Sequence, residues 1–350
     1  MNFKLQLFLL LILALVFFSG CKQNTSSTTD YLHFRGQVMG TGYSIKLRNN
    51  STISTDLLKL SSHQKLVQVD LLMSTYKPES ELSRFNAFAE NKEFKLSSPT
   101  FRVFTEALLC NLKTGGSYDI TVGPLVNLWG FGSAGRRKTP PSKEEIQKTL
   151  NSVGSNLLQL NRGKMSIYKT KADVYCDLSS LAKGFAVDRV AEFYEEKGIV
   201  DYFIELGGEV RCKGKNPHGK KWRIGIEKPQ RDAPERALFK TILLENGAVA
   251  TSGNYRNFFE YNGKFYSHTI NSKTGCPVES SDSVLSATVV GPECMRADAL
   301  ATSLMAAPKD KSIEIIKKFP GYECFLLVPG NKGEIIIQQS EGFSRLLNSE

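Results

Sequence analysis

The sequence predicts an α+β fold, a single large domain in which mixed sheets are packed by helices. Segments that alternate between apolar and polar residues, as strands do, lie between segments whose apolar residues recur every three or four positions, as in helices. The two kinds of segment follow no regular strand–helix–strand period, and no internal repeat is visible. Both observations favour α+β over a doubly wound parallel sheet.

The predicted strands share a period of two residues. They are MGTGYSIKL at 39–47, WRIGIE at 222–227, FKTILL at 239–244, VLSATVV at 284–290 and GEIIIQQ at 333–339. Asn262–Gly263, between FFEY and KFYSHTI, predicts a hairpin with a two-residue turn, because both residues tolerate the positive φ angles of that turn.

The predicted helices cover about 57–74, 100–113 and 181–197, and the last ends at Gly198. SKEE, from Ser142 to Glu145, is a capping box that opens a short helix.

The segment RADALATSLMAA at 296–307 predicts one further helix, with Ala297, Leu300, Ala301 and Leu304 forming an apolar stripe. Asp298 and Thr302 are also four residues apart, on the margin of this stripe. Two interpretations remain open. Asp298 is a dipole partner at the helix start and Thr302 a neutral filler, or their oxygens bind a hard cation such as Mg²⁺.

The first residues predict export. MNFKLQLFLLLILALVFFSG has one lysine and then an apolar run too short for a confident membrane span. Small residues directly precede Cys21, which resembles the bacterial lipobox, where the cysteine is lipidated. We therefore expect a signal peptide at 1–20, the lipidated Cys21 with a polar tether at 21–33, and one domain at 34–350.

Composition argues against several functional classes. The net charge of +10 is spread along the chain, which argues against nucleic acid and fits anionic lipid or a phosphate-bearing ligand better. Four histidines without a His/Cys cluster argue against a zinc site. Six cysteines follow Cys21, none in a CxxC pair. An exported protein could pair some of them, but their apolar surroundings favour buried free thiols.

The segment GFGSAG at 130–135 matches the dinucleotide pattern G-x-G-x-x-G, which must open a helix to bind phosphate. Here RRKTPPS follows, and its two prolines exclude a helix. We therefore interpret this segment as a surface loop.

Two polar residues in otherwise apolar segments are candidates for ligand binding. Asp119, in GGSYDITVGPLVNLWGFG, either caps its own loop or holds a polar ligand group. Lys183, in DLSSLAKGFAVDRVAEF, is expected in the first turn of a helix. It is either solvated or part of a phosphate cradle, in which Gly184 removes a side chain from the approach.

His268 is expected at a strand end, just before the turn residues NSKTG. A lone histidine in a strand is usually structural. Its neighbours Ser267 and Thr269, in a segment rich in Asn and Gly, also fit a general base beside a site.

Seven motifs, in this order, closely resemble the ApbE family of flavin transferases, from about residue 34 to beyond 330. They are MGTGYSIKL, MSTYKPESELSRFN, YDITVGPLVNLWGFG, DLSSLAKGFAVDRVA, YFIELGGEVRCKG, ATSGNYRNFFEYNGKFYSHTINSKTGCP and ADALATSLM. The resemblance implies an ApbE-like (T-fold-like) domain that binds FAD and Mg²⁺, splits the pyrophosphate and moves FMN onto a Thr or Ser hydroxyl, leaving AMP. It implies acceptor proteins such as Nqr- and Rnf-type redox-pump subunits, and a lipid anchor on the periplasmic side of the cell inner membrane.

By position, the resemblance also implies roles for individual residues. The metal ligands would be Asp298, Thr302 and the backbone carbonyl of Ser180, while Lys183 would contact FAD and His268 would take the proton of the acceptor hydroxyl. The flavin and adenosine pockets would be lined by Met39, Tyr76, Ser117, Tyr118, Asp119 and Ile270. Two alternatives stay open, an FAD pyrophosphatase that releases free FMN and a flavin-binding lipoprotein without catalysis.

Overall fold

The computed structural model describes residues 31–137, 139–229, 237–254, 258–278, 284–330 and 334–347. These residues belong to one compact unit that begins at Tyr31. The expected signal peptide, Cys21 and the tether as far as residue 30 lie outside the described residues. Strand β1 (Tyr31–Val38) begins before the expected domain start at residue 34, so 31–33 are strand rather than tether.

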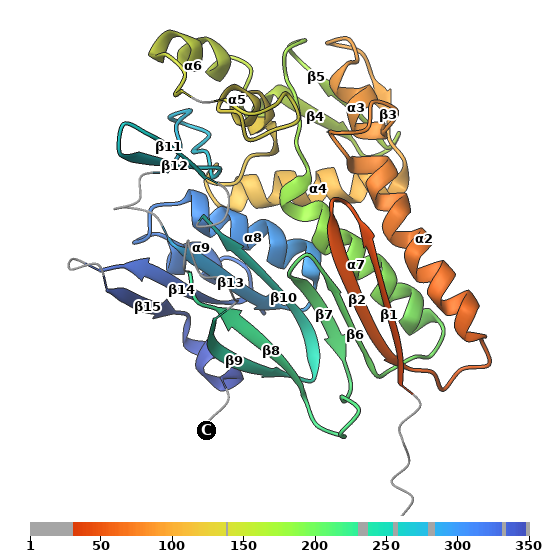
Figure 1. Ribbon diagram of the computed structural model, residues 1–350. Helices are drawn as coiled ribbons and strands as arrows, with labels where there is room; N and C mark the ends of the chain where they lie inside the picture. The colour runs from red at the N-terminus through yellow and green to blue at the C-terminus, as the bar shows by residue number, and fades with distance from the viewer. Residues whose placement is uncertain are drawn as a thin grey trace, which may run out of the picture. The chain divides into compact units, whose positions relative to one another are not determined.

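A fully antiparallel eight-stranded sheet forms the centre of this unit (Figure 1). Neighbouring strands pair antiparallel throughout, as an α+β fold requires. In spatial order the strands are β1, β2 (Thr41–Arg48), β6 (Tyr202–Leu206), β7 (Glu209–Lys213), β10 (Asn246–Gly253), β13 (Ser286–Gly291), β14 (Glu323–Pro329) and β15 (Ile335–Gln339).

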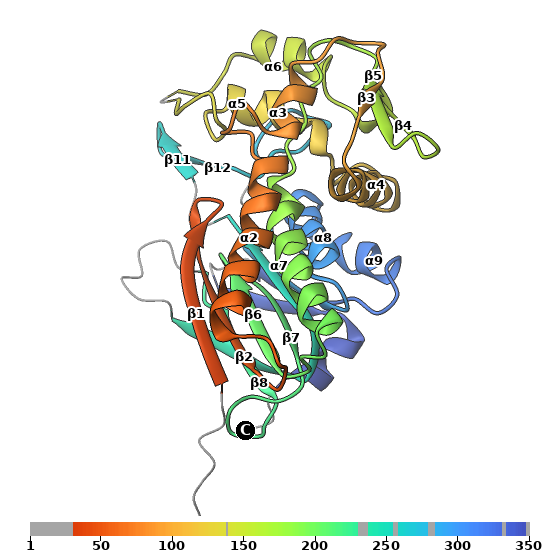
Figure 2. The same ribbon diagram turned by 90° about the vertical axis from the view of Figure 1, so that its right-hand side faces the viewer.

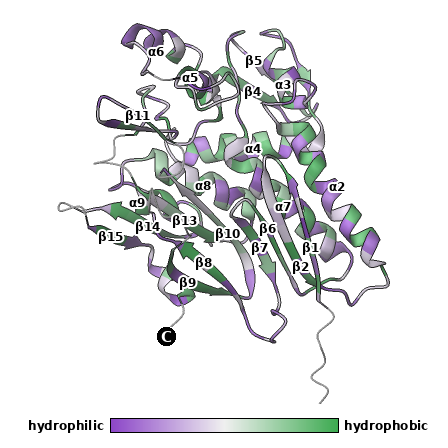
Figure 3. Ribbon diagram, in the orientation of Figure 1, coloured by the Kyte–Doolittle hydropathy of each residue, from purple (hydrophilic) through white to green (hydrophobic). Residues whose placement is uncertain are grey.

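The two faces of this sheet bury separate hydrophobic clusters, because successive side chains of a strand point to opposite faces. One face packs against helices α2 (Thr55–Met73), α7 (Ser179–Glu196), α8 (Cys294–Ala306) and α9 (Ser312–Lys317) (Figure 2). The other face packs against β8 (Trp222–Glu227), β9 (Leu238–Leu244) and the 3₁₀ helix Glu341–Leu346. Hydrophobic stretches run along the central strands, whereas helix α6 is hydrophilic (Figure 3).

A smaller layer lies at one end of the sheet, at the top of Figure 1. Part of it has its own small core around Trp129 and Ile270. Its elements are α3 (Glu81–Asn86), β3 (Phe94–Lys95), α4 (Ser98–Lys113), the 3₁₀ helices Ile120–Val122 and Ser155–Leu157, α5 (Gly123–Leu128), α6 (Lys143–Leu150), β4 (Leu158–Asn161), β5 (Ser166–Lys169), β11 (Phe258–Tyr261) and β12 (Lys264–Ser267).

The predicted helices are all present, and α2, α4, α7 and α8 each begin two residues earlier than predicted. The apolar repeat marks the buried part of a helix, and these helices begin with residues that precede that repeat. The capping box from Ser142 to Glu145 is formed at the start of α6.

The predicted strands are present with shifted ends, except that 222–227 coincides with β8. The strand predicted at 39–47 begins only at Thr41, because Met39 and Gly40 have φ angles of 53° and 71° and form the turn after β1. Asn262 and Gly263, with φ angles of 50° and 72°, join β11 to β12 as the hairpin signal predicted.

Five cysteines are buried free thiols, as their apolar surroundings predicted. They are Cys110, Cys176, Cys212, Cys294 and Cys324. Cys276 has intermediate exposure. Within the described ranges, we find no helix that is both long enough and apolar enough to cross a bilayer.

Candidate active site

A cavity of about 450 Å³ lies where the smaller layer meets α7, α8 and the sheet. Its lining includes every site residue expected within the domain except Met39. These residues are Tyr76, Ser117, Tyr118, Asp119, Ser180, Lys183, His268, Ile270, Asp298 and Thr302. The chain thus brings together side chains that lie more than 200 positions apart in the sequence.

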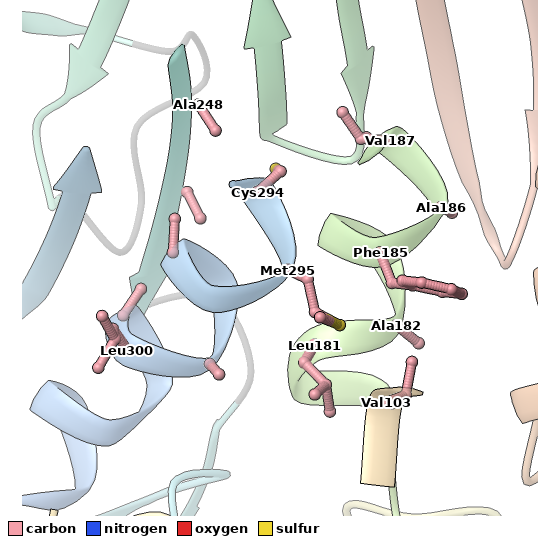
Figure 4. Packing of buried hydrophobic residues seen from close by; sticks show 14 of the residues in the cluster. Val103, Leu181, Ala182, Phe185, Ala186, Val187, Ala248, Cys294, Met295 and Leu300 are labelled. Atoms are coloured by element: carbon pink, nitrogen blue, oxygen red, sulfur yellow. The ribbon is translucent and has the colours of Figure 1, made fainter. Parts of the chain in front are cut away.

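Helices α7 and α8 pack side by side in opposite directions (Figure 4). Asp188, in the third turn of α7, accepts the N–H groups of Cys294 at 3.0 Å and Met295 at 2.8 Å, and so caps the start of α8. Nearer the start of α7, the N–H of Gly184 donates to Asp298 Oδ2 at 3.1 Å. The first turn of α7 therefore lies beside the second half of α8, which carries Thr302.

Gly184 permits this close helix packing. A Cβ atom built on it would lie 2.4 Å from the carbonyl oxygen of Cys294, on the backbone of α8. The missing side chain makes room for a helix and not for a ligand, so the interpretation of Gly184 as part of a phosphate cradle is wrong. Because α7 begins at Ser179, Lys183 lies in the second turn rather than in the expected first turn.

Asp298 is a buried carboxylate, with only 2% of its surface exposed. It is the fifth residue of α8, so the expectation of a helix-start partner is wrong, and it is buried with the apolar stripe rather than lying on its margin. Burial raises the pKa of Asp298 to about 6, although the nearby ammonium of Lys183 and the N–H of Gly184 act in the opposite direction. A buried carboxylate at a cavity wall is stabilised by a bound cation.

The other expected metal ligands contribute neutral oxygens. The hydroxyl of Thr302 lies 3.3 Å from Ser252 Oγ, and the hydroxyl of Ser180 lies 2.9 Å from the phenolic oxygen of Tyr118. The side-chain hydroxyl of Ser180 thus contacts the loop of Tyr118. The backbone carbonyl oxygen of Ser180 remains as the expected ligand of the metal ion. One carboxylate, one hydroxyl and one carbonyl form an all-oxygen set, which fits Mg²⁺.

Lys183 lies between two carboxylates. Its Nζ is 3.3 Å from Glu209 Oε1. Burial lowers the pKa of Lys183, but the charges of Asp298 and Glu209 outweigh burial and hold the pKa above the usual 10.5. Burial also raises the pKa of Glu209 above its usual value, although Lys183 acts against this rise. The lysine therefore keeps its positive charge beside the candidate cation site.

Asp119 forms the hydrogen bonds expected of a loop cap. Its carboxylate accepts the N–H of Thr121 at 2.8 Å and the N–H of Ser155 at 3.0 Å, and it also accepts from the amide of Asn111 at 3.2 Å. Of the two open interpretations, these contacts match the first. Asp119 fixes the loop that carries Ser117 and Tyr118 along the cavity wall.

His268 follows β12 directly, at the strand end where it was expected. Its ring meets the ring of Phe131 edge-on, with the centroids 6.4 Å apart. Phe131 and Gly132 belong to the segment GFGSAG, and both line the cavity. The segment forms no helix and is a loop at the surface, as predicted, and it also forms part of the cavity wall.

The remaining expected residues lie around the cavity. Tyr76 is 72% exposed and lines the cavity, so its ring is accessible for stacking on a flat ligand. Met39 is not among the lining residues, because it forms the turn between β1 and β2. The start of β2, directly after that turn, still adjoins the cavity, since Gly207, a lining residue, donates its N–H to the carbonyl of Gly42 at 3.1 Å.

The profile of the ApbE family matches residues 39–326. The chain belongs to the ApbE family. It is 39% identical over 329 residues to a protein from Haemophilus influenzae named FAD:protein FMN transferase, covering 92% of this chain and 93% of that one. A protein of the same name from Vibrio cholerae is also 39% identical, over 88% and 89% of the two chains.

Solved ApbE structures have the same fold. The flavin transferase ApbE from Vibrio cholerae superposes with a TM-score of 0.82 at 37% identity, over 91% of this chain and 99% of that one. The apo form of the flavinyl transferase ApbE from Pseudomonas stutzeri gives a TM-score of 0.81 at 31% identity, over 91% and 98%. The ApbE-like domain predicted from the motifs is therefore confirmed.

Two acidic residues of this ApbE cavity were not anticipated, Asp177 and Glu209. Asp177 accepts the N–H of Ser179 at 2.8 Å and so supports the start of α7. An acid two residues before a helix is a recognisable capping signal, so the sequence held a clue to Asp177. Glu209 had only a weak signal, its place directly after the glycine pair 207–208.

Proposed function

We propose that this ApbE-family chain is a Mg²⁺-dependent FAD:protein FMN transferase. The reaction moves FMN from FAD to a Thr or Ser hydroxyl of an acceptor protein and releases AMP. The names of the relatives support the reaction class. The observation that carries the proposal is that Asp298, Thr302, Lys183 and His268 line one cavity.

Asp298, Thr302 and the carbonyl of Ser180 would hold the Mg²⁺ ion, and the buried negative charge of Asp298 supports this assignment. When bound, the ion supplies positive charge that neutralises the pyrophosphate and the departing AMP. Lys183 adds a fixed positive charge on the same wall, and it is held by Glu209. These residues bind and orient the phosphates for attack at one phosphorus atom.

In the transfer step, the acceptor oxygen attacks the phosphorus on the flavin side of the pyrophosphate. A phosphorus–oxygen bond forms to the acceptor, and the bond from that phosphorus to the bridging oxygen breaks. The electron pair of the broken bond leaves with AMP. His268, which lines the same cavity, takes the proton of the acceptor hydroxyl.

We place this enzyme on the periplasmic side of the inner membrane, anchored by lipid at Cys21, with Nqr- or Rnf-type subunits as acceptors. The support is the apolar run of residues 1–20 and the small residues before Cys21. The acceptor class rests on the resemblance of the motifs alone. When cells are grown with a labelled fatty acid, we expect the label on the natural chain and none on the Cys21→Ser variant. Labelling of both chains would contradict the anchor.

The proposed reaction is tested by incubating residues 22–350 with FAD, Mg²⁺ and a candidate acceptor subunit. We expect covalent fluorescent flavin on the acceptor and an equal amount of AMP. Free FMN with AMP and no labelled acceptor would favour the pyrophosphatase. Binding of FAD that ignores Mg²⁺ and releases no AMP would favour the carrier.

The role of His268 has its own test. His268→Ala should slow transfer by about 10²- to 10⁴-fold, the usual contribution of a general base, because the acceptor proton loses its receiver. FAD affinity, measured by flavin fluorescence, should stay within a few-fold of the natural chain. Loss of FAD binding together with transfer would show that the ring positions the ligand instead.

A further inference from the structure

Glu209 is a buried acid on the cavity wall. The proposed reaction gives a role to only one of its carboxylate oxygens, the one that holds Lys183. Glu209 begins β7, directly after the turn Gly207–Gly208. Val210 and Cys212 belong to the cluster on the β8–β9 side of the sheet. Because side chains alternate along a strand, Glu209 faces the helices and the cavity.

The two carboxylate oxygens of Glu209 have different environments. Oε1 lies 3.3 Å from Lys183 Nζ. Oε2 is buried and has no hydrogen-bond partner among the residues that the structure describes. Only 4% of the residue surface is exposed. A buried charged oxygen without a partner is costly, so a site that keeps one is prepared for a donor from outside the chain.

The backbone turn beside Glu209 is held in place before any ligand arrives. The turn beside it is held to β2 by the hydrogen bond from Gly207 to Gly42 at 3.1 Å. On its other side, Glu205 accepts the N–H of Gly208 at 2.8 Å. Such preorganisation reduces the entropy lost when a ligand is bound.

The chemistry of the cavity restricts the donor. Lys183 and the candidate cation ligands recognise phosphate, whereas a carboxylate oxygen recognises an O–H or N–H group. In a dinucleotide, the donors nearest the pyrophosphate are the hydroxyl groups of the two sugar portions.

We propose that Glu209 is a substrate-binding residue, whose Oε1 holds Lys183 and whose Oε2 accepts a hydrogen bond from a sugar hydroxyl of FAD adjacent to its pyrophosphate. The identity of the ligand rests on the proposed function. The hydroxyl belongs either to the ribityl chain on the flavin side or to the ribose on the adenosine side.

The test measures equilibrium binding of FMN alone and of AMP alone, with Mg²⁺ present, by the natural chain and by Glu209→Gln. We expect one mononucleotide to lose about 10- to 100-fold in affinity, the usual range for a hydrogen bond to a charged group, and the other to change much less. Loss for FMN assigns the ribityl chain, and loss for AMP assigns the ribose. Glu245→Gln, the same change at an exposed acid that does not line the cavity, should bind both normally.

A double variant separates direct binding from an effect transmitted through Lys183. In a Lys183→Met background, Glu209→Gln should still weaken the same mononucleotide by a similar factor. If the second change has no further effect, or if Glu209→Gln binds both mononucleotides like the natural chain, the proposal is overturned.

Thermal unfolding verifies that each variant is folded. If Glu209→Gln does not fold, Glu209→Asp replaces it. This change keeps the charge but draws the oxygens back from the cavity. We expect Glu209→Asp to weaken the same mononucleotide, and unchanged affinity would again contradict the proposal. Because these measurements follow binding alone, a chain that binds normally but transfers no FMN would count against the proposed reaction and not against this site.

Discussion

At the scale of single residues, burial decides between interpretations that spacing leaves open. From its spacing alone, Asp298 was open to interpretation as a helix-start partner or as a metal ligand. It lies in the second turn of α8, fully buried, with one oxygen on the N–H of Gly184. For Asp119, the contacts with Thr121 and Ser155 match the interpretation as a loop cap rather than as a ligand-binding residue.

Asp298→Asn tests the charge at the candidate cation site. The amide keeps the shape of the side chain but removes its negative charge, so Mg²⁺-dependent transfer should fall by about 100-fold or more. The measurement is initial transfer rate against Mg²⁺ concentration. Asp310→Asn changes an exposed acid and should leave the rate unaltered. A natural rate and natural Mg²⁺ dependence in the Asp298→Asn variant would contradict the metal site.

At the scale of elements, α7 and α8 form a reciprocal pair that fixes the geometry of the cavity. Asp188 of α7 caps the start of α8, and Asp298 of α8 accepts an N–H from α7. Arg211, from β7, neutralises Asp188 at 2.7 Å. These contacts set which turn of one helix faces which turn of the other, and so set the distance from Ser180 to Thr302.

Gly184→Ala should disrupt this pair. The new methyl group would meet the α8 backbone, which cannot yield as a flexible side chain would, so we expect a loss of about 1–3 kcal/mol in the free energy of unfolding. Urea unfolding measures the loss. Gly163→Ala is the matched control, because its Cβ would meet only Asn161 Oδ1 at an ordinary 3.6 Å. Equal stability of the two variants would show that the helices do not need this close approach.

Asp188→Ala should be among the most destabilising single changes in the chain. It removes the cap of α8 and leaves the Arg211 guanidinium without its buried partner, at a cost of about 3–5 kcal/mol. Urea unfolding again gives the free energy. Adding Arg211→Met should recover part of the loss, since the charge that lost its buried partner, and keeps only the longer contact with Glu195 at 3.8 Å, is then gone. If the double variant is less stable than Asp188→Ala, the loss does not come from the unpaired charge.

At the scale of the whole molecule, the antiparallel sheet separates two hydrophobic clusters, and the cavity lies at one end of the helix-covered side. The catalytic candidates therefore lie at a junction of the sheet, the paired helices and the smaller layer. Five of the free thiols are buried, and none of the cysteines that the structure describes lines the cavity.

The thiol state predicts how the folded chain reacts. Burial raises the pKa of Cys212 and Cys324 to about 12, so at pH 8 the reactive thiolate is scarce as well as shielded. We expect the buried thiols to react with a disulfide reagent only after denaturation. Reductant should leave the unfolding midpoint unchanged. A midpoint that falls in reductant would contradict this state. So would rapid reaction, in the folded chain, of any of the five buried cysteines, which peptide mapping distinguishes from the more exposed Cys276.

The sequence by itself determined the local structure. Apolar periodicity located the long helices, and the pair Asn262–Gly263 located a hairpin. The ordered motifs identified the family and ten of the 25 residues that line the cavity. These signals are readable because propensity, capping and turn chemistry act over a few neighbouring residues.

Only the tertiary structure decided what faces what. Glu209 and Arg211 alternate with apolar residues on a strand, a pattern typical of polar side chains facing water, yet both pair with buried or half-buried residues of α7. From the sequence, Gly184 was interpreted as leaving room for a ligand, whereas in the structure it leaves room for the backbone of α8. The fate of a charged or small side chain depends on which distant element packs against it, and that partner is fixed by the packing of the whole chain.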